Sequence, residues 1–450
     1  MRRTVIFALL FVSIVLSAQD KFVERRLDNV LMDAVTLLDN SEYDKSLRLL
    51  KQLEKIDSTS DAVQYYIGYC NYLKGDNEAA LEYLRKASSL DPGNPWYREV
   101  LATACQAAGK YAECRDILIG LYKEYPSRYA SPYIYSLLGE KAFLEGDLQT
   151  ALKRYNEALE MDENYSPAIL GLAEVYGRSS NIPAFLTNLK RFLSSGDVGS
   201  ADKVEYLSNM ISQIDGSFFF SWSAQLDDLV QTVADAPDAG PEALKYAGQW
   251  FYGTERKEKG YEYFNRWLEK FPDDYEANAT VMQIALVDKR YRDAAASFDR
   301  LFELAGDDKE KLLELYSLAG DTYHELGDEA LAFSSYKKAL KIDPEYAPVL
   351  NNYAYYLCQK GKSMRKALKM SAISVKVDSE NSSYLDTYGW ILYLLKRPEE
   401  AKVQFKRAMV FGGHDSDVVL DHYAVVLEAL GEREAAEYYR SLAEKKRNGK

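Results

Sequence analysis

Hydrophobic and polar positions along this chain repeat with a period of 34 residues over most of its length. The clearest copy occupies residues 66–92, where apolar and small residues at helical spacing are interrupted at Gly75-Asp76 before a second amphipathic stretch begins. Copies begin near residues 27, 61, 95, 132, 166, 241, 275, 313, 347, 382 and 417, and five of their spacings are 34 residues. Each copy predicts two short helices. A Gly or a polar pair ends the first helix, and Pro or Asp-Pro ends the second.

Small side chains recur at matched places in the two predicted helices, which allows their backbones to approach closely. On the first helix these places hold Gly68, Ala102, Gly139, Ala173, Gly248, Gly320, Ala354, Gly389 and Ala424. On the second helix they hold Ala80, Cys114, Ala151, Ala294, Ala332, Ala401 and Ala436. Larger residues one turn later, such as Leu84, Tyr155 and Tyr336, are expected to close the seam between the two helices.

This pattern resembles the tetratricopeptide repeat, and the resemblance covers roughly residues 27–446. It implies an all-α fold: an α-α superhelix, or tetratricopeptide solenoid, of about eleven to twelve helix-turn-helix units. In this family each helix pair packs on its neighbours, and the first helices line a concave groove.

The repeat loses its signature between residues 200 and 240, although helical content persists there. Gly216, Pro237, Gly240 and Pro241 interrupt the segment. It is therefore either a degenerate repeat or a joint between two arrays. We expect an N-terminal array over residues 19–199 and a C-terminal array over residues 241–450.

The N-terminus has the character of a secretory signal peptide over residues 1–18. Arg2 and Arg3 precede an uninterrupted apolar run, Val5 to Leu16, and small residues for a peptidase follow up to Ala18. The run is short for a transmembrane helix, so an uncleaved membrane anchor is the alternative. The segment is similar to the signals of bacterial exported proteins. We expect the periplasm, with the cell surface as another destination, and no integral membrane span after cleavage.

The chain is acidic, with a formal net charge of −13. Removal of residues 1–18 would shift the side-chain charge to −15. An acidic protein is repelled by phosphate backbones and anionic lipids, so we do not expect nucleic acid as a partner.

Four cysteines matter because export leads to an oxidising compartment. Cys105 and Cys114 lie on the two helices of one unit, on either side of the Gly109-Lys110 turn, so antiparallel packing should bring them close. One possibility is a disulfide that staples this hairpin. The other is that both simply fill small seam positions.

Catalytic motifs are not evident in the sequence. The three histidines include His414 and His422, which with Asp421 flank the last turn between repeats and form the one imaginable metal-dependent hydrolase site. No phosphate-binding loop, nucleophile elbow or zinc-protease motif occurs. We therefore expect no enzymatic activity, no metal and no cofactor.

Tyrosine is abundant, with 36 residues, and part of this excess falls at groove-lining places. The positions that line the groove in the resembling family correspond here to Tyr65, Tyr69, Tyr72, Trp96, Tyr133, Phe143, Tyr355, Trp390 and Tyr393. Aromatic residues suit a groove that holds a peptide or a partner helix. The alternative is that these rings pack against the next unit. A basic clamp for chaperone tails is not expected, because only Lys245 beside Gln249 falls at such places.

Together these features predict an exported, non-enzymatic scaffold or adaptor that binds protein partners in a bacterial cell envelope. One alternative is an envelope-assembly or secretion accessory factor that holds unfolded clients. The other is the metal-dependent hydrolase. The sequence names no partner and does not indicate an oligomeric state.

Overall fold

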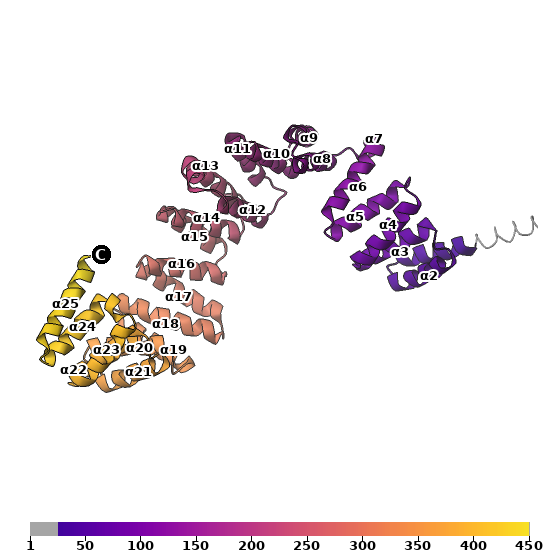
Figure 1. The fold of residues 1–450 in the computed structure, drawn as a ribbon. Coiled ribbons are helices and arrows are strands. Elements are labelled where there is room, and N and C mark those ends of the chain that lie inside the picture. Colours follow the sequence, from indigo (N-terminus) through magenta and orange to yellow (C-terminus); the bar gives the residue numbers. More distant parts are fainter. Residues whose placement is uncertain (1–25, 450) are drawn as a thin grey trace, which may run out of the picture. The chain divides into compact units, whose positions relative to one another are not determined.

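The structure is a computed structural model that describes residues 26–449 (Figure 1). All regular elements in this range are helices, and no strand occurs within it. The predicted all-α solenoid is therefore confirmed. The predicted signal peptide lies outside the described residues. None of the described helices combines the length and apolar character needed to cross a bilayer.

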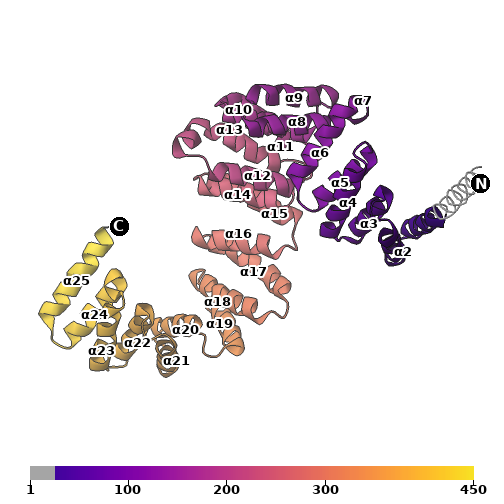
Figure 2. The ribbon, with the colours of Figure 1, turned by 45° about the vertical axis from the view of Figure 1, so that its right-hand side comes forward.

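The chain divides into two compact units, the first ending at Val233 and the second beginning at Ala234. In the first unit, residues 26–39 are helical and precede a series of hairpins, which Figure 2 shows from indigo to magenta. Its helices are α2 (Tyr43–Ile56), α3 (Asp61–Lys74), α4 (Asn77–Leu90), α5 (Pro95–Ala107), α6 (Tyr111–Glu124), α7 (Pro126–Tyr129), α8 (Pro132–Glu145), α9 (Leu148–Met161), α10 (Ser166–Arg178), α11 (Ile182–Leu193), α12 (Ser200–Ser212) and α13 (Gly216–Ala234).

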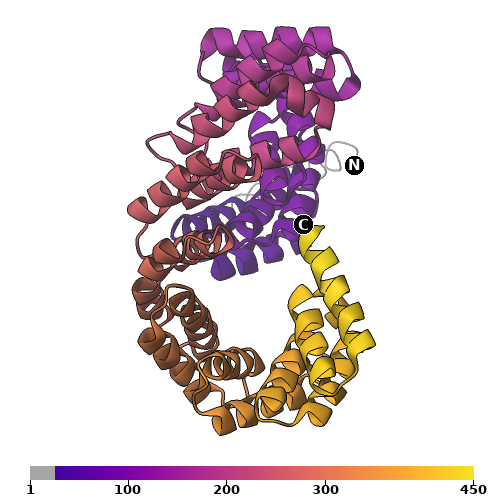
Figure 3. The same cartoon turned by 90° about the vertical axis from the view of Figure 1, so that its left-hand side faces the viewer.

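The second unit continues with hairpins that follow a curve, seen in Figure 3 from brown to yellow. Its helices are α14 (Pro241–Gly253), α15 (Lys257–Lys270), α16 (Tyr275–Val287), α17 (Tyr291–Ala305), α18 (Lys309–Glu325), α19 (Glu329–Ile342), α20 (Ala347–Gln359), α21 (Met364–Val377), α22 (Ser382–Leu394), α23 (Pro398–Val410), the short 3₁₀ helix η1 (Gly413–Asp415), α24 (Asp417–Ala429) and α25 (Arg433–Asn448).

The turn inside a hairpin is encoded by the Gly-Asp pair of the repeat. Between α18 and α19, Gly327 has a φ of +78°, which is accessible to glycine without the steric cost that other residues meet. Asp328 then caps α19, because its Oδ1 accepts the backbone N–H of Leu331 at 3.0 Å. Two adjacent residues thus end one helix and start the next.

The seam inside a hairpin depends on the small residue of the first helix. A Cβ atom on Gly320 would lie 2.2 Å from a ring carbon of Tyr336, which is fully buried on α19. The backbone of α18 therefore rests directly on this ring. The predicted pairing of small and large residues across the seam is present here.

Neighbouring hairpins also touch through their first helices. Contacts join α3 to α5 and α8 to α10 in the first unit, and they join α18, α20, α22 and α24 in succession in the second. We call these eight helices the inner helices, because their mutual contacts place them on the inner side of the curved rows of hairpins.

Two segments depart from the regular repeat. The four-residue helix α7 is inserted before α8 and accounts for a spacing of 37 residues between two copies. Residues 200–240 contain α12 and α13, and α13 is interrupted by non-helical backbone at Trp222.

Candidate protein-binding surfaces

All nine predicted groove residues lie on inner helices: Tyr65, Tyr69 and Tyr72 on α3, Trp96 on α5, Tyr133 and Phe143 on α8, Tyr355 on α20, and Trp390 and Tyr393 on α22. They form separate groups within each unit.

A row of tyrosines follows α3 in the first unit. Stacked ring centroids lie 6.0 Å apart for Tyr65 and Tyr69, and 6.4 Å apart for Tyr69 and Tyr72. The three rings are half-buried, and burial raises the pKa of the Tyr65 hydroxyl to about 12. Tyr97 of α5 stacks on Tyr65 at 4.7 Å, and its hydroxyl donates to Asp61 at 3.0 Å. The row is thus an aromatic surface whose rings are held by their stacking contacts.

Trp96 is the most exposed of the predicted groove residues, with 59% of its surface accessible. The guanidinium of Arg128 lies 4.5 Å from its ring centre and donates to Glu99 at 3.0 Å. The Tyr129 hydroxyl also donates to Glu99. Arg128 and Tyr129 belong to the inserted helix α7, which therefore places a guanidinium over the exposed indole ring of Trp96. In the sequence, the sign of this insertion is the 37-residue spacing between the copies near residues 95 and 132, which by itself does not indicate a binding residue.

Tyr133 and Phe143 lie at opposite ends of α8. Tyr133 is 41% exposed. Phe143 is half-buried beneath the guanidinium of Arg178, which lies 5.1 Å from its ring centre and donates to its backbone carbonyl at 3.0 Å. The two rings are therefore separate contact points on one helix.

In the second unit an aromatic and polar group joins α22 to α24. The rings of Trp390 and Tyr393 are stacked at 5.2 Å, and His422 stacks on Trp390 at 4.0 Å. His422 Nδ1 lies 2.8 Å from Asp386 Oδ1, and Asp386 is only 6% exposed. Asp386 was not among the predicted site residues, because nothing in its local sequence marks a contact with a residue 36 positions later.

A polar chain joins α18 to α20 on the same inner side. Asp321 Oδ1 accepts the Tyr336 hydroxyl and, at 2.9 Å, the amide of Asn352. The amide of Asn351 donates to Asn352 Oδ1 at 3.2 Å, while Asn351 Oδ1 has no hydrogen-bond partner among the described residues. Burial raises the pKa of the Asp321 carboxyl despite its two donors. Tyr355, the predicted residue on α20, is half-buried, and its ring centroid lies 5.7 Å from that of Tyr356.

The residues considered for a metal site have separate partners. His414 is exposed beside Asp415, Asp421 pairs with Arg447, and His422 faces Asp386. Within residues 26–449, no group of three or more His, Cys, Asp or Glu side chains is arranged to hold a metal ion. The geometry gives the hydrolase hypothesis no support.

Cys105 and Cys114 are both buried and both free, and they pack in one apolar cluster of the first unit. The structure thus places them at small seam positions and contains no bridge between them. Burial raises the pKa of the Cys105 thiol to about 11, so it is a poor nucleophile at neutral pH.

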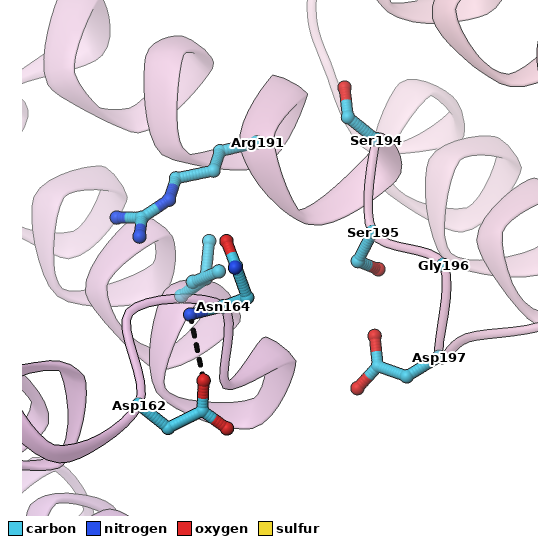
Figure 4. Close-up of a pocket in the computed structure, with 8 residues that line it drawn as sticks. Asp162, Asn164, Arg191, Ser194, Ser195, Gly196 and Asp197 are labelled. Atoms are coloured by element: carbon cyan, nitrogen blue, oxygen red, sulfur yellow. Dashed lines mark hydrogen bonds between the residues drawn. The ribbon is translucent and has the colours of Figure 1, made fainter.

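A pocket of about 540 Å³ lies between the α9–α10 turn and the loop that follows α11 (Figure 4). Its carboxylates are engaged with the chain itself: Asp162 Oδ1 accepts the backbone N–H of Asn164 at 3.0 Å, and Asp197 accepts the Ser166 hydroxyl. We interpret it as a space between repeat turns whose polar groups hold the backbone. Its lining residues are Asp162, Asn164, Ile169, Arg191, Ser194, Ser195, Gly196 and Asp197.

Comparison with known proteins agrees with this geometry. Models of the tetratricopeptide repeat family match residues 31–95 and 71–139 in the first unit, and residues 313–346 and 335–367 in the second. A TPR repeat-containing protein of Methanocaldococcus jannaschii is 21% identical over 385 residues; the match covers 73% of this chain and 66% of that relative's length.

Two solved structures are similar at low identity. One is the APC/C hetero-tetramer Cut9-Hcn1, with 13% identity, a TM-score of 0.37, and coverage of 94% of this chain and 88% of that chain. The other is the C-terminal part of a TPR repeat-containing protein from Cytophaga hutchinsonii, with 14% identity, a TM-score of 0.35, and coverage of 64% and 98%. From its family-model matches and its hairpin geometry, this chain carries tetratricopeptide repeats in both of its units.

Proposed function

We propose that this protein is an exported, non-catalytic scaffold of a bacterial cell envelope that binds a protein partner along its inner helices. Tetratricopeptide repeats commonly present an extended binding surface for proteins, because the stacked hairpins leave one side of each first helix open. The proposal depends on whether the inner aromatic residues are available to a partner or only pack the hairpins.

One observation carries the proposal: two of the predicted groove aromatics on the inner helices are exposed, whereas the aromatics that close the hairpin seams are buried. Seam aromatics on the second helices are buried, with Tyr155 at 3% exposure and Tyr336 and Phe405 at 0%. On the inner helices, Trp96 and Tyr133 are 59% and 41% exposed. Packing between hairpins therefore explains the first class and leaves the second accessible, and accessible aromatic residues are frequent binding hot spots.

The inner rings are also held in place before any partner arrives. The tyrosine row of α3 is stacked, and Arg128 lies over Trp96 while bound to Glu99. A ring that is already ordered loses less conformational entropy on binding. This favours a recognition surface made of fixed anchors.

Export rests on the sequence of residues 1–18 alone. If the signal is cleaved after Ala18, the mature protein begins at Gln19. N-terminal sequencing of the protein from its native cells should find Gln19. An intact N-terminus on a membrane-attached protein would instead indicate the uncleaved anchor.

Partner binding is tested by site-specific photo-cross-linking in the native envelope. A photoreactive amino acid replaces Trp96 on the inner helix α5 in one variant and Tyr111 on the second helix α6 in a control. Tyr111 is 70% exposed, so the two probes have comparable access to solvent. We expect discrete cross-linked proteins from position 96 and none from position 111.

Equal cross-linking from both positions, or none from position 96, would contradict binding along the inner helices. The cross-linked species also separates two kinds of partner. If an unfolded polypeptide added before irradiation prevents the cross-link, the protein acts by holding unfolded clients and not as a scaffold for a folded one.

A further inference from the structure

The inner helices of the second unit provide few cations of their own. No lysine or arginine occurs in α20, α22 or α24. The carboxylates of α24 are instead neutralised by α25, where Arg447 pairs with Asp417 and Asp421 and Arg440 pairs with Glu428 at 2.5 Å. The last hairpin therefore neutralises the acidic groups of its first helix with arginines of its second helix.

An oxygen acceptor occupies the same repeat position on four successive inner helices. The position is three residues before the small seam residue, and it holds Ser317, Asn351, Asp386 and Asp421. At Asp421 the acceptor is paired with the guanidinium of Arg447. The chain thus contains one example of this position satisfied by a basic side chain.

Among the described residues Asp386 has no lysine or arginine partner, and it faces an imidazole that is a cation only when protonated. It is 6% exposed, and the contact that the structure gives its carboxylate is with His422 Nδ1 at 2.8 Å. A buried carboxylate is costly unless it is paired and hydrogen-bonded. A lysine or arginine from outside the chain would neutralise it as Arg447 neutralises Asp421.

Asn351 supplies an independent sign that a donor is missing. Its side chain is 7% exposed, and its Oδ1 is a buried acceptor with no partner among the described residues. Its own amide is already used on Asn352. Buried acceptors are normally satisfied, and an amide oxygen can only be satisfied by an N–H or O–H donor.

The aromatic rings on the same two helices have the same preference. Tyr355, Trp390 and Tyr393 are half-buried on α20 and α22. Aromatic ring faces attract ammonium and guanidinium groups. Carboxylate, amide oxygen and ring face are all electron-rich, so the surface matches a cationic donor and mismatches an acidic one.

We propose that the inner surface of α18–α24 binds a protein segment rich in lysine or arginine, with Asp386 and Asn351 as acceptors for its side chains. This inference rests on the proposed function and specifies the chemistry of the partner. It also fits the net charge of −13, which attracts basic segments over longer distances.

The test measures binding of fluorescent peptides to the full chain by anisotropy. The probes are an alternating lysine-glycine peptide and an alternating glutamate-glycine peptide, each at low and at physiological ionic strength. We expect the lysine peptide to bind, with an affinity that decreases with salt, and the glutamate peptide not to bind. Asp386→Asn should weaken the lysine peptide about tenfold, because it removes one charge from the acceptor row.

Asp299→Asn is the matched control, since Asp299 is an exposed carboxylate on the second helix α17. It loses the same charge and should change the affinity less than about twofold. If Asp386→Asn alters the circular dichroism spectrum, Asn351→Leu replaces it, because this variant removes an acceptor without changing charge. It should also weaken lysine-peptide binding.

Binding of the glutamate peptide, failure of both peptides to bind, or equal effects of Asp386→Asn and Asp299→Asn would each overturn the inference. None of these results affects cross-linking at Trp96 in the first unit. The inference about partner chemistry can therefore fail while the proposed function stands.

Discussion

The contact between Gly320 and Tyr336 makes the stability of a hairpin sensitive to a single methyl group. In Gly320→Ala the new Cβ would lie 2.2 Å from Cε1 and 2.5 Å from Cδ1 of the Tyr336 ring. The ring is fully buried, stacks on Tyr353 at 5.6 Å, and is tied by its hydroxyl to Asp321. Because it cannot swing into solvent, either α18 must move from α19 or the ring must leave its hydrogen bond.

Two opposing terms determine the size of the effect. Alanine is favoured over glycine inside a helix by about 1 kcal/mol. Overpacking a fixed core costs about 1–3 kcal/mol, and the short approach here places the cost near the upper end. We therefore expect Gly320→Ala to lower the free energy of unfolding by about 1–2 kcal/mol.

Gly253 is the matched control for this substitution. It lies at the end of α14 in the same unit, and a Cβ there would meet nothing within 4 Å. Only the propensity term remains, so Gly253→Ala should be neutral or stabilising by up to about 1 kcal/mol. The same substitution is thus expected to lower the free energy of unfolding at position 320 and to leave it unchanged or raise it at position 253.

Urea denaturation of the full chain, followed by circular dichroism, measures the difference between the variants. Hydrogen exchange at α18 and α19 then shows whether the loss is local, as expected for repeats that contact only their neighbours. If Gly320→Ala were as stable as Gly253→Ala, the ring would not be fixed against α18, and our account of the seam would be wrong.

Three further results are expected. Asp321→Asn should raise the urea midpoint at pH 7, and this gain should shrink as the pH falls toward 4. Burial raises the pKa of the Asp321 carboxyl in the folded state above 3.8, so its ionisation at higher pH costs stability. The asparagine amide does not ionise and avoids this cost. Thiol titration of the unfolded chain without reductant should find four thiols, and a value of two would indicate a Cys105–Cys114 bridge. Lys203 is 2% exposed and donates to the Ser195 carbonyl. Lys203→Ala should lower the free energy of unfolding by about 3 kcal/mol, and Lys203→Met, which keeps the packing, should lower it by about half as much. Equal melting temperatures for the two variants would contradict this.

The hairpins and their seams could be predicted because their cause is local in the sequence. Gly327-Asp328 ends one helix and caps the next through atoms within four residues. The pairing of Gly320 with Tyr336 repeats at a fixed spacing, since both helices of a hairpin have nearly constant length. Periodicity therefore reveals which residues face each other inside one unit.

The binding surfaces could be predicted only in outline. The inner position of Trp96 followed from the repeat register, but the arrival of Arg128 over its ring depends on where α7 folds. Likewise, His422 drew attention as a possible metal ligand, whereas its contact is Asp386 on the preceding inner helix. The two contacts join residues 32 and 36 positions apart, on different helices of the row.

The sequence by itself determined the helical hairpin, its turn, its seam and the set of residues that line the inner helices. Only the tertiary structure decided how far each inner ring is exposed, which carboxylates are paired, and where Asn351 is left without a donor. The physical reason is that the angle between successive hairpins is set by the combined packing of many side chains. No short pattern in the sequence reports that angle, and the electrostatics of the inner surface depend on it.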